Sequence, residues 1–245
     1  MVFEGLLTGH TAVDLAILVF VVVVMPLTSM MAGRRLASAP PRSLVPRYLR
    51  IMARGWAIVT VVIAAWWLLG RPFSELGLGW PIPFWGRLGF LFDALAAIVL
   101  GVQLVRLGKL VKPENFPRYR RMIEEVKIAP RTAPELGVFL LTSVTGGIWE
   151  ELVYRGFLIW FLTPLSGIAG AVVLSSLVFG LAHVYQSWRA IFRTGAFGLV
   201  VGVAYVLSGS LWWLMVAHAL ADINGGITIW RLTAIMREEP QSGPA

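Results

Sequence analysis

Apolar stretches long enough to cross a membrane recur along this chain. The first lies at 12–31 and reads AVDLAILVFVVVVMPLTSMM, with a single acid. A helix rises ~1.5 Å per residue, so about 20 apolar residues span the hydrocarbon core of a bilayer. Charged residues make up only 14% of the chain, whereas a soluble domain contains about 25%. The sequence therefore predicts an all-α fold, a polytopic bundle of membrane-spanning helices.

We expect about seven crossings, and eight if the run at 134–163 is two short helices broken at its charged residues. The first run has no basic segment ahead of it and exceeds the apolar length of a signal peptide, so we expect it to be retained, with a kink at Pro26. The predicted helices are 12–31, 55–69, 88–107, 134–163, 168–184, 189–207 and 211–230.

Basic residues between these runs indicate how the chain is oriented. Six arginines lie in 32–54, and seven lysines and arginines lie in 109–133. Because such residues concentrate on the cytoplasmic side, both segments should lie inside and the amino terminus outside. If 134–163 is one helix, the later arginines and the carboxyl terminus also lie inside, which favours seven crossings. We expect a multi-pass protein of the cell membrane, and the short loops favour a bacterial inner membrane.

Three regions follow from this division: amino-terminal helices with basic loops at 1–133, a four-helix core at 134–231 and a short cytoplasmic tail at 232–245. Residues 114–128 mix charged with aromatic and aliphatic side chains, so they could form a surface helix or a solvated loop.

Composition also excludes several classes of function. The net charge is +8, but no basic strip interleaved with aromatic residues is present, so we expect no nucleic-acid partner. Membrane lipids are the expected surroundings. The chain has no cysteine, which rules out disulfides, thiolate metal sites and a cysteine nucleophile.

Ionisable residues interrupt the later apolar runs. IWEELVYRGF at 148–157 contains Glu150, Glu151 and Arg155 between uncharged flanks, and the following helices contain His183, His218 and Asp222. The helical rise places Glu150, His183, His218 and Asp222 at a similar depth. An unpaired charge there costs about 3 kcal/mol on insertion scales, so such groups face the bundle interior and usually mark function.

The spacings of these residues suggest which of them pair with each other and which stay free. Glu151 and Arg155 are four residues apart and can form an ion pair along the helix, whereas Glu150 is turned about 100° away, which leaves its carboxylate free. His218 and Asp222 share one helix face, with small alanines between them that permit close helix approach.

One free carboxylate, two imidazoles and a further carboxylate suit amide hydrolysis. A glutamate can take a proton from water, a histidine can hold that water, and further donors can stabilise the oxyanion. The same four side chains could instead bind zinc. No HExxH, GxSG or GxGD signature of other intramembrane hydrolases is present.

EELVYR at 150–155, FGLAH at 179–183 and HALAD at 218–222 resemble, in this order, the EExxxR, FxxxH and HxxxN/D motifs of the CAAX prenyl protease and bacteriocin-processing (CPBP, or Abi) family. The resemblance covers about 134–230, and FSELGL at 73–78 is similar to a stretch often seen ahead of that core.

The resemblance implies an intramembrane endopeptidase that opens toward the cytosol. Glu150 and His183 would activate water, and His218 and Asp222 would line the oxyanion side. Glu151, Arg155 and Phe179 would support the site, Phe179 by packing. The family is described both as metalloproteases and as metal-free glutamate proteases, so zinc is one expectation and a metal-free site the other. The expected substrate is a membrane-bound peptide or lipidated peptide.

Asp222 departs from the asparagine of eukaryotic-type prenyl proteases. An ionised aspartate cannot donate to an oxyanion. It would have to be protonated, ligate a metal or orient His218. Two other functions use the same residues: a non-catalytic regulatory or partner-binding membrane protein that retains the polar cluster for packing, and a transporter that uses it as a relay.

Overall fold

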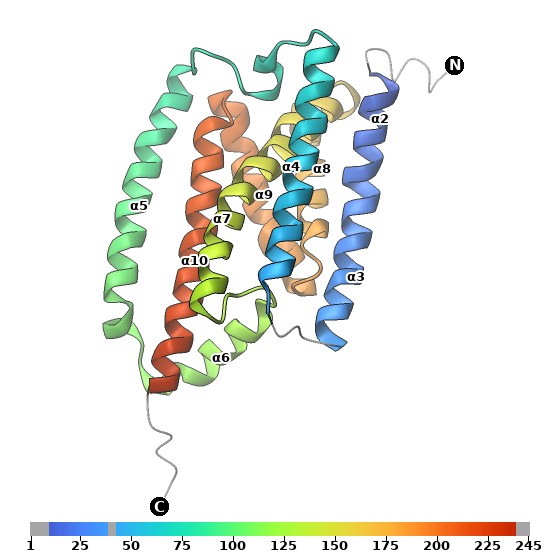
Figure 1. The fold of residues 1–245 in the computed structure, drawn as a ribbon. Coiled ribbons are helices and arrows are strands. Elements are labelled where there is room, and N and C mark those ends of the chain that lie inside the picture. Colours follow the sequence, from blue (N-terminus) through green and yellow to red (C-terminus); the bar gives the residue numbers. More distant parts are fainter. Residues whose placement is uncertain (1–9, 39–42, 239–245) are drawn as a thin grey trace, which may run out of the picture.

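The computed structural model describes residues 10–38 and 43–238, and within them every regular element is a helix (Figure 1). The elements are α2 (Ala12–Val19), the π-helix η1 (Phe20–Val24), α3 (Met25–Ser38), α4 (Val45–Leu68), the 3₁₀ turn η2 (Phe73–Leu76), α5 (Phe84–Leu110), the 3₁₀ turn η3 (Pro113–Asn115), α6 (Phe116–Glu125), α7 (Ala133–Glu150), the π-helix η4 (Glu151–Leu158), α8 (Ile159–Ala182), α9 (Trp188–Ser208) and α10 (Trp212–Glu238).

Within the described part of the chain, five helical segments are long and apolar enough to cross a membrane: 12–35, 45–68, 84–109, 133–182 and 188–208. This confirms the predicted bundle of membrane-spanning helices. The segment 133–182 reverses at Gly167, whose φ of 69° lies in the left-handed region that favours glycine. After the reversal Ser175 Oγ donates to the Tyr154 carbonyl oxygen, 2.6 Å away. With that reversal and with α10, the arrangement accommodates the seven expected crossings.

The run at 134–163 is not broken at its charges, because α7, η4 and the start of α8 follow one another without a gap. Pro26 is likewise accommodated inside a helical stretch, directly after the π-helical turn η1. Proline has no backbone N–H and so cannot make the usual helical hydrogen bond. The π-turn, with its wider hydrogen-bond spacing, lets the helix continue past Pro26.

The start of one predicted helix and the end of another need correction. The helix predicted at 55–69 begins at Val45, so the arginines 47, 50 and 54 lie on α4 and not in a loop; Pro46 stands in its first turn, where proline suits a helix start. The helix predicted at 211–230 continues to Glu238, so the tail expected from 232 begins as helix, and 239–245 lie outside the described residues. Of the two alternatives left open for 114–128, the structure has the helix, since Phe116–Glu125 form α6.

Small residues let the core helices approach closely. A Cβ on Gly147 of α7 would lie 2.5 Å from the Met215 carbonyl oxygen of α10, and a Cβ on Gly180 of α8 would lie 2.5 Å from the Ile191 carbonyl oxygen of α9. Only glycine permits such backbone contacts between helices in a membrane. These contacts set the spacing of the helices that carry the ionisable residues.

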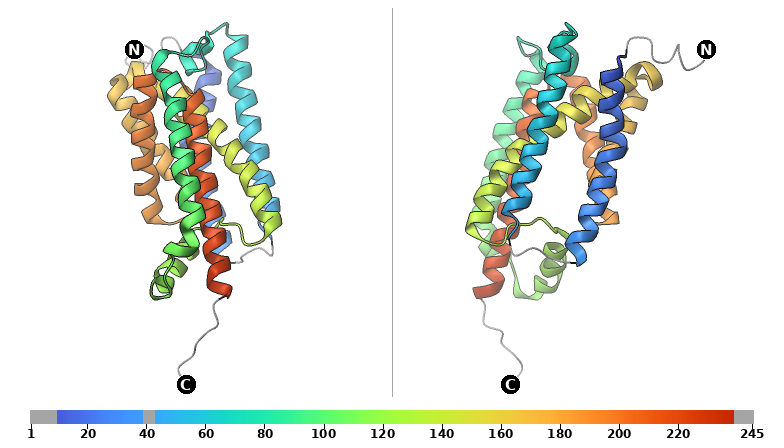
Figure 2. Two further views of the ribbon diagram at one scale, coloured as in Figure 1. Left: turned by 90° about the vertical axis from the view of Figure 1, so that its left-hand side faces the viewer. Right: turned by 45° about the vertical axis from the view of Figure 1, so that its right-hand side comes forward.

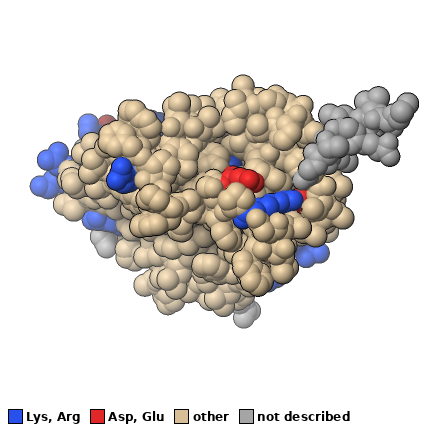
Figure 3. Space-filling model, turned by 90° about the horizontal axis from the view of Figure 1, so that it is seen from above, with Lys and Arg blue, Asp and Glu red and all other residues tan. Residues whose placement is uncertain are grey.

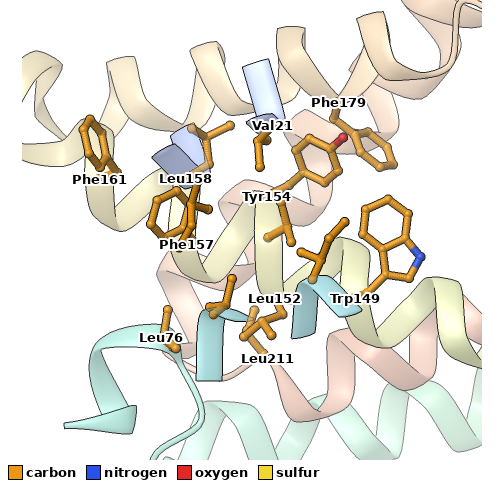
Figure 4. Close-up of a cluster of buried hydrophobic side chains, with 14 of the residues drawn as sticks. Val21, Leu76, Trp149, Leu152, Tyr154, Phe157, Leu158, Phe161, Phe179 and Leu211 are labelled. Carbon is orange, nitrogen blue, oxygen red and sulfur yellow. The ribbon is translucent and has the colours of Figure 1, made fainter. Parts of the chain in front are cut away.

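A hydrophobic cluster fills the bundle around η4 (Figure 4). Leu152, Tyr154 and Phe157 are buried there. The FSELGL stretch closes one end of this cluster, because Leu76 is fully buried and the Gly77 carbonyl oxygen accepts from Leu211 N at 2.9 Å. The end of the bundle at which α2 begins shows few charged side chains (Figure 3).

Candidate functional site

The two adjacent glutamates lie where α7 passes into η4. Hydrogen bonds in a π-helix skip one more residue than in an α-helix, and short π segments are frequent at functional sites. The Glu151 side chain is fully buried, whereas that of Glu150 is 14% exposed. The neighbours therefore occupy different environments.

Glu151 is held by two partners. Arg155 Nη1 donates to its Oε1 at 3.0 Å, which confirms the ion pair predicted along the helix. The same oxygen lies 2.6 Å from His218 Nδ1 of α10, a contact that the sequence analysis did not foresee. A carboxylate only accepts, so Nδ1–H of His218 donates and the ring is fixed with Nε2 directed away from Glu151.

Glu150 has no such partner. Its Oε2 is buried and makes no hydrogen bond within the described part of the chain. It lies 3.9 Å from His183 Nε2 and 3.8 Å from His218 Nε2. These separations are too long for direct hydrogen bonds but leave room for one bridging water. The structure thus agrees with the expectation that the Glu150 carboxylate stays free of Arg155.

His183 follows the last residue of α8, and its ring is held by that helix. Its Nδ1 lies 2.9 Å from the carbonyl oxygen of Phe179. A carbonyl accepts only, so Nδ1 carries the proton and the lone pair of Nε2 faces Glu150. Phe179 is buried and packs against the His183 ring with 4.7 Å between centroids, which agrees with its predicted packing role.

Asp222 lies at the rim of this cluster. Its Oδ2 is 3.9 Å from His218 Nε2, and its side chain is 49% exposed. Among the roles considered for Asp222, orienting His218 falls instead to Glu151, which is 1.3 Å closer to that ring. Gly146 leaves the space between Asp222 and Glu150 open: a Cβ there would lie 3.8 Å from one carboxylate and 4.0 Å from the other.

Helix α9 also contributes, which the sequence analysis missed. Arg155 Nη2 donates to the Gly198 carbonyl oxygen at 3.3 Å, and its guanidinium carbon lies 4.5 Å from the Phe179 ring centroid. The Phe197 ring lies 5.6 Å from that of His218. The small residues in GAFGLVVG at 195–202 are the signal in the sequence that indicates this close approach.

A cavity of about 600 Å³ reaches Glu150 and His183 between α3, α4, α7 and the end of α8. Tyr185 also lines it. The Arg47 guanidinium carbon lies 5.5 Å from the Tyr185 ring centroid. Burial raises the pKa of Tyr185 to about 12, so the phenol stays neutral near pH 7.

The four ionisable groups are donor types that zinc accepts. In the described residues, however, no group of three or more His, Cys, Asp or Glu side chains is arranged to hold a metal ion. The imidazole and carboxylate atoms face one another across 3.8–3.9 Å. As placed, these side chains do not fit a bound zinc ion.

Comparison with known families shows what part of the chain is similar to. Residues 132–224 match the family described as Rce1-like, the type II CAAX prenyl endopeptidases. No curated protein and no solved structure matches the chain. The matched region begins at the cap of α7 and ends two residues after Asp222, so it contains every predicted site residue.

Proposed function

We propose that this multi-pass membrane protein is an intramembrane endopeptidase of the CAAX-protease/Abi type, because residues 132–224 match the Rce1-like CAAX prenyl endopeptidases, a protease family. Its substrate would be a membrane-associated peptide or lipoprotein. One observation carries the proposal: the Glu150 carboxylate has no hydrogen-bond partner among the described residues and faces the Nε2 atoms of two histidines.

In this proposal Glu150 is the general base. A water between Glu150 and His183 donates one proton to the carboxylate while its oxygen attacks the peptide carbonyl carbon. His218, in its protonated form, donates from Nε2 to the developing oxyanion, and Glu151 holds its ring in place. The proton taken by Glu150 then passes to the leaving amine nitrogen as the carbon–nitrogen bond breaks. Asp222 would line the oxyanion side at the rim, where it must be protonated to donate.

No step of this mechanism needs a metal ion. Whether the protein uses zinc can be tested directly. Purified protein should contain well under one zinc per chain, and cleavage should survive dialysis against a chelator. The measurement is elemental analysis together with a cleavage assay before and after dialysis. Loss of activity that added zinc restores would support the metalloprotease alternative and reject the metal-free proposal.

The location is part of the proposal. The basic residues on α4 and α6 would lie on the cytoplasmic side of a bacterial inner membrane, with the amino terminus outside and the carboxyl terminus inside. The cavity beside α4 would then open toward the cytosol.

The test compares membrane peptides in cells. Strains that express the wild-type protein or Glu150→Ala are analysed by mass spectrometry, and each accumulated or missing fragment is traced to its parent. The proposal expects at least one membrane-bound peptide that is cleaved only in the wild type, and cleavage of that peptide by purified protein. Identical peptide populations at equal protein levels would count against proteolysis, and a fall in yield of Glu150→Ala alone would indicate a packing role.

A further inference from the structure

The cavity has one basic wall. Arg47, Arg50 and Arg54 occur at three- and four-residue spacing on α4, so they share one side of the helix, and all three line the cavity that reaches Glu150. Among the described residues that line it, Glu150 carries the one carboxylate. No carboxylate of the described chain forms an ion pair with any of these three arginines.

The opposite wall comes from α3 and is mixed: the apolar Met25, Met31 and Ala32 line the cavity together with Thr28, Ser29 and Arg35. Helix α3 packs on α8, and α4 packs on α7. Figure 2 shows the two helices apart from each other on one side of the bundle. Ser29 Oγ ties α3 to the end of α8 by donating to the Ala182 carbonyl oxygen. An occupant of this cavity would therefore meet a mixed apolar and polar wall on the α3 side and the three arginines on the α4 side.

Setting the orientation of the protein in the membrane does not by itself explain why these arginines line the cavity. An arginine that only sets orientation can stay in water, yet Arg47 Nε is buried and makes no hydrogen bond within the described residues. Its guanidinium lies over the Tyr185 ring. Arg50 Nε donates to the Pro46 carbonyl oxygen, which holds the side chain along the helix. A guanidinium presents several donors in a planar fork that matches a carboxylate.

We propose that Arg47, Arg50 and Arg54 select substrates by binding a carboxylate of the substrate peptide, either an acidic side chain or the terminal carboxylate of its chain. This rests on the proposed function, because the cavity ends at the groups assigned to the scissile bond. A peptide that reaches Glu150 through the cavity must pass the arginines. Opposite charge along that path attracts the correct substrate and rejects a basic one.

The test uses three synthetic peptides that share one lipid anchor and one sequence. The first carries two aspartates and an amidated end, the second has asparagines in their place, and the third has asparagines with a free terminal carboxylate. Cleavage is measured as kcat/KM for wild type, for the double variant Arg50→Gln/Arg54→Gln and for Arg120→Gln, a charge-matched control on α6 outside the cavity. Binding of labelled peptides to the Glu150→Gln protein, with and without the double variant, is measured separately.

We expect wild type to favour one of the carboxylate peptides over the neutral one by at least about tenfold, the effect of losing a charge-assisted hydrogen bond. The two carboxylate peptides show which source is used. The ratio should fall toward one in the double variant and persist in Arg120→Gln.

Equal ratios in wild type and the double variant would overturn the proposal. It would also be overturned if the arginines changed only binding to vesicles with anionic lipid, because they would then bind headgroups. A carboxylate preference in binding to Glu150→Gln without cleavage by any form would leave the recognition proposal standing and reject the protease. Cleavage of all three peptides without a preference would support the protease and reject the recognition proposal.

Discussion

Arg155 connects three parts of the site through one side chain. It pairs with Glu151 of η4, donates to the Gly198 carbonyl oxygen of α9 and lies over the Phe179 ring of α8. The guanidinium is 1% exposed, so each partner replaces water that the charge has lost. Removing one partner of a buried ion pair destabilises the fold strongly, because the other charge stays buried without a partner. Replacing the whole pair by apolar residues changes the stability much less.

At this scale Arg155→Lys tests whether the guanidinium shape matters. An ammonium cannot reach both Glu151 and the Gly198 carbonyl oxygen in one plane, and it offers no flat face to Phe179. We expect the free energy of unfolding to fall by about 3 kcal/mol. Thermal unfolding in detergent measures this, with Arg120→Lys on the exposed face of α6 as control. Equal melting temperatures for both variants would refute the structural role of Arg155.

Sequence reasoning reached some of these contacts and not others. The Glu151–Arg155 pair could be predicted because four residues along one helix are always neighbours. The contact from Glu151 to His218 spans 67 positions. It depends on how η4 and α10 are rotated toward each other, which no local pattern specifies. The same holds for the contact between Arg47 and the Tyr185 ring, which joins residues far apart in the sequence.

Among the elements, the pairing of α7 with α10 decides whether Glu150 and His218 can meet. Gly147 touches the backbone of Met215 and lies beside Ala219, next to His218. The alanines of HALAD were expected to allow close approach, and Gly147 is their counterpart on the facing helix. The presence of each spanning helix could be predicted from the length of its apolar run. The start of α4 could not, because its first turns contain the arginines 47, 50 and 54, and such a basic segment is typical of a loop.

Gly147→Ala tests this packing, with Gly137→Ala on the same helix as the matched control. A Cβ at Gly147 would lie 2.5 Å from a backbone oxygen, while at Gly137 nothing lies within 4 Å. Overpacking of this kind costs about 1–3 kcal/mol. Gly147→Ala should lower both the unfolding temperature and the cleavage rate, and Gly137→Ala should match wild type or exceed it in stability. Similar behaviour of the two variants would show that the α7–α10 distance is not limiting.

For the whole molecule, the proposed orientation places the ends of the bundle in different solvents. The turn η2 and the helix α6 lie at opposite ends of the bundle (Figure 1). Ser74 of η2 and Arg120 of α6 are both exposed. The chain has no cysteine, so a single introduced thiol gives an unambiguous signal.

Ser74→Cys should react with a membrane-impermeant maleimide in intact cells, and Arg120→Cys only in inverted vesicles. The opposite pattern would place the amino terminus inside and turn the arginine-lined cavity away from the cytosol. Labelling of both from one side would contradict a spanning bundle with these ends.

The division of work between neighbouring glutamates is the central claim, and it is tested by comparing Glu150→Gln with Glu151→Gln in purified protein. The measurement is the single-turnover cleavage rate together with the unfolding temperature of each variant. We predict that Glu150→Gln loses cleavage by about 100-fold or more at near wild-type stability, since its carboxylate has no described hydrogen-bond partner to lose. Glu151→Gln should lose stability as well, because Arg155 and His218 lose their shared carboxylate. Wild-type cleavage by Glu150→Gln would contradict the account.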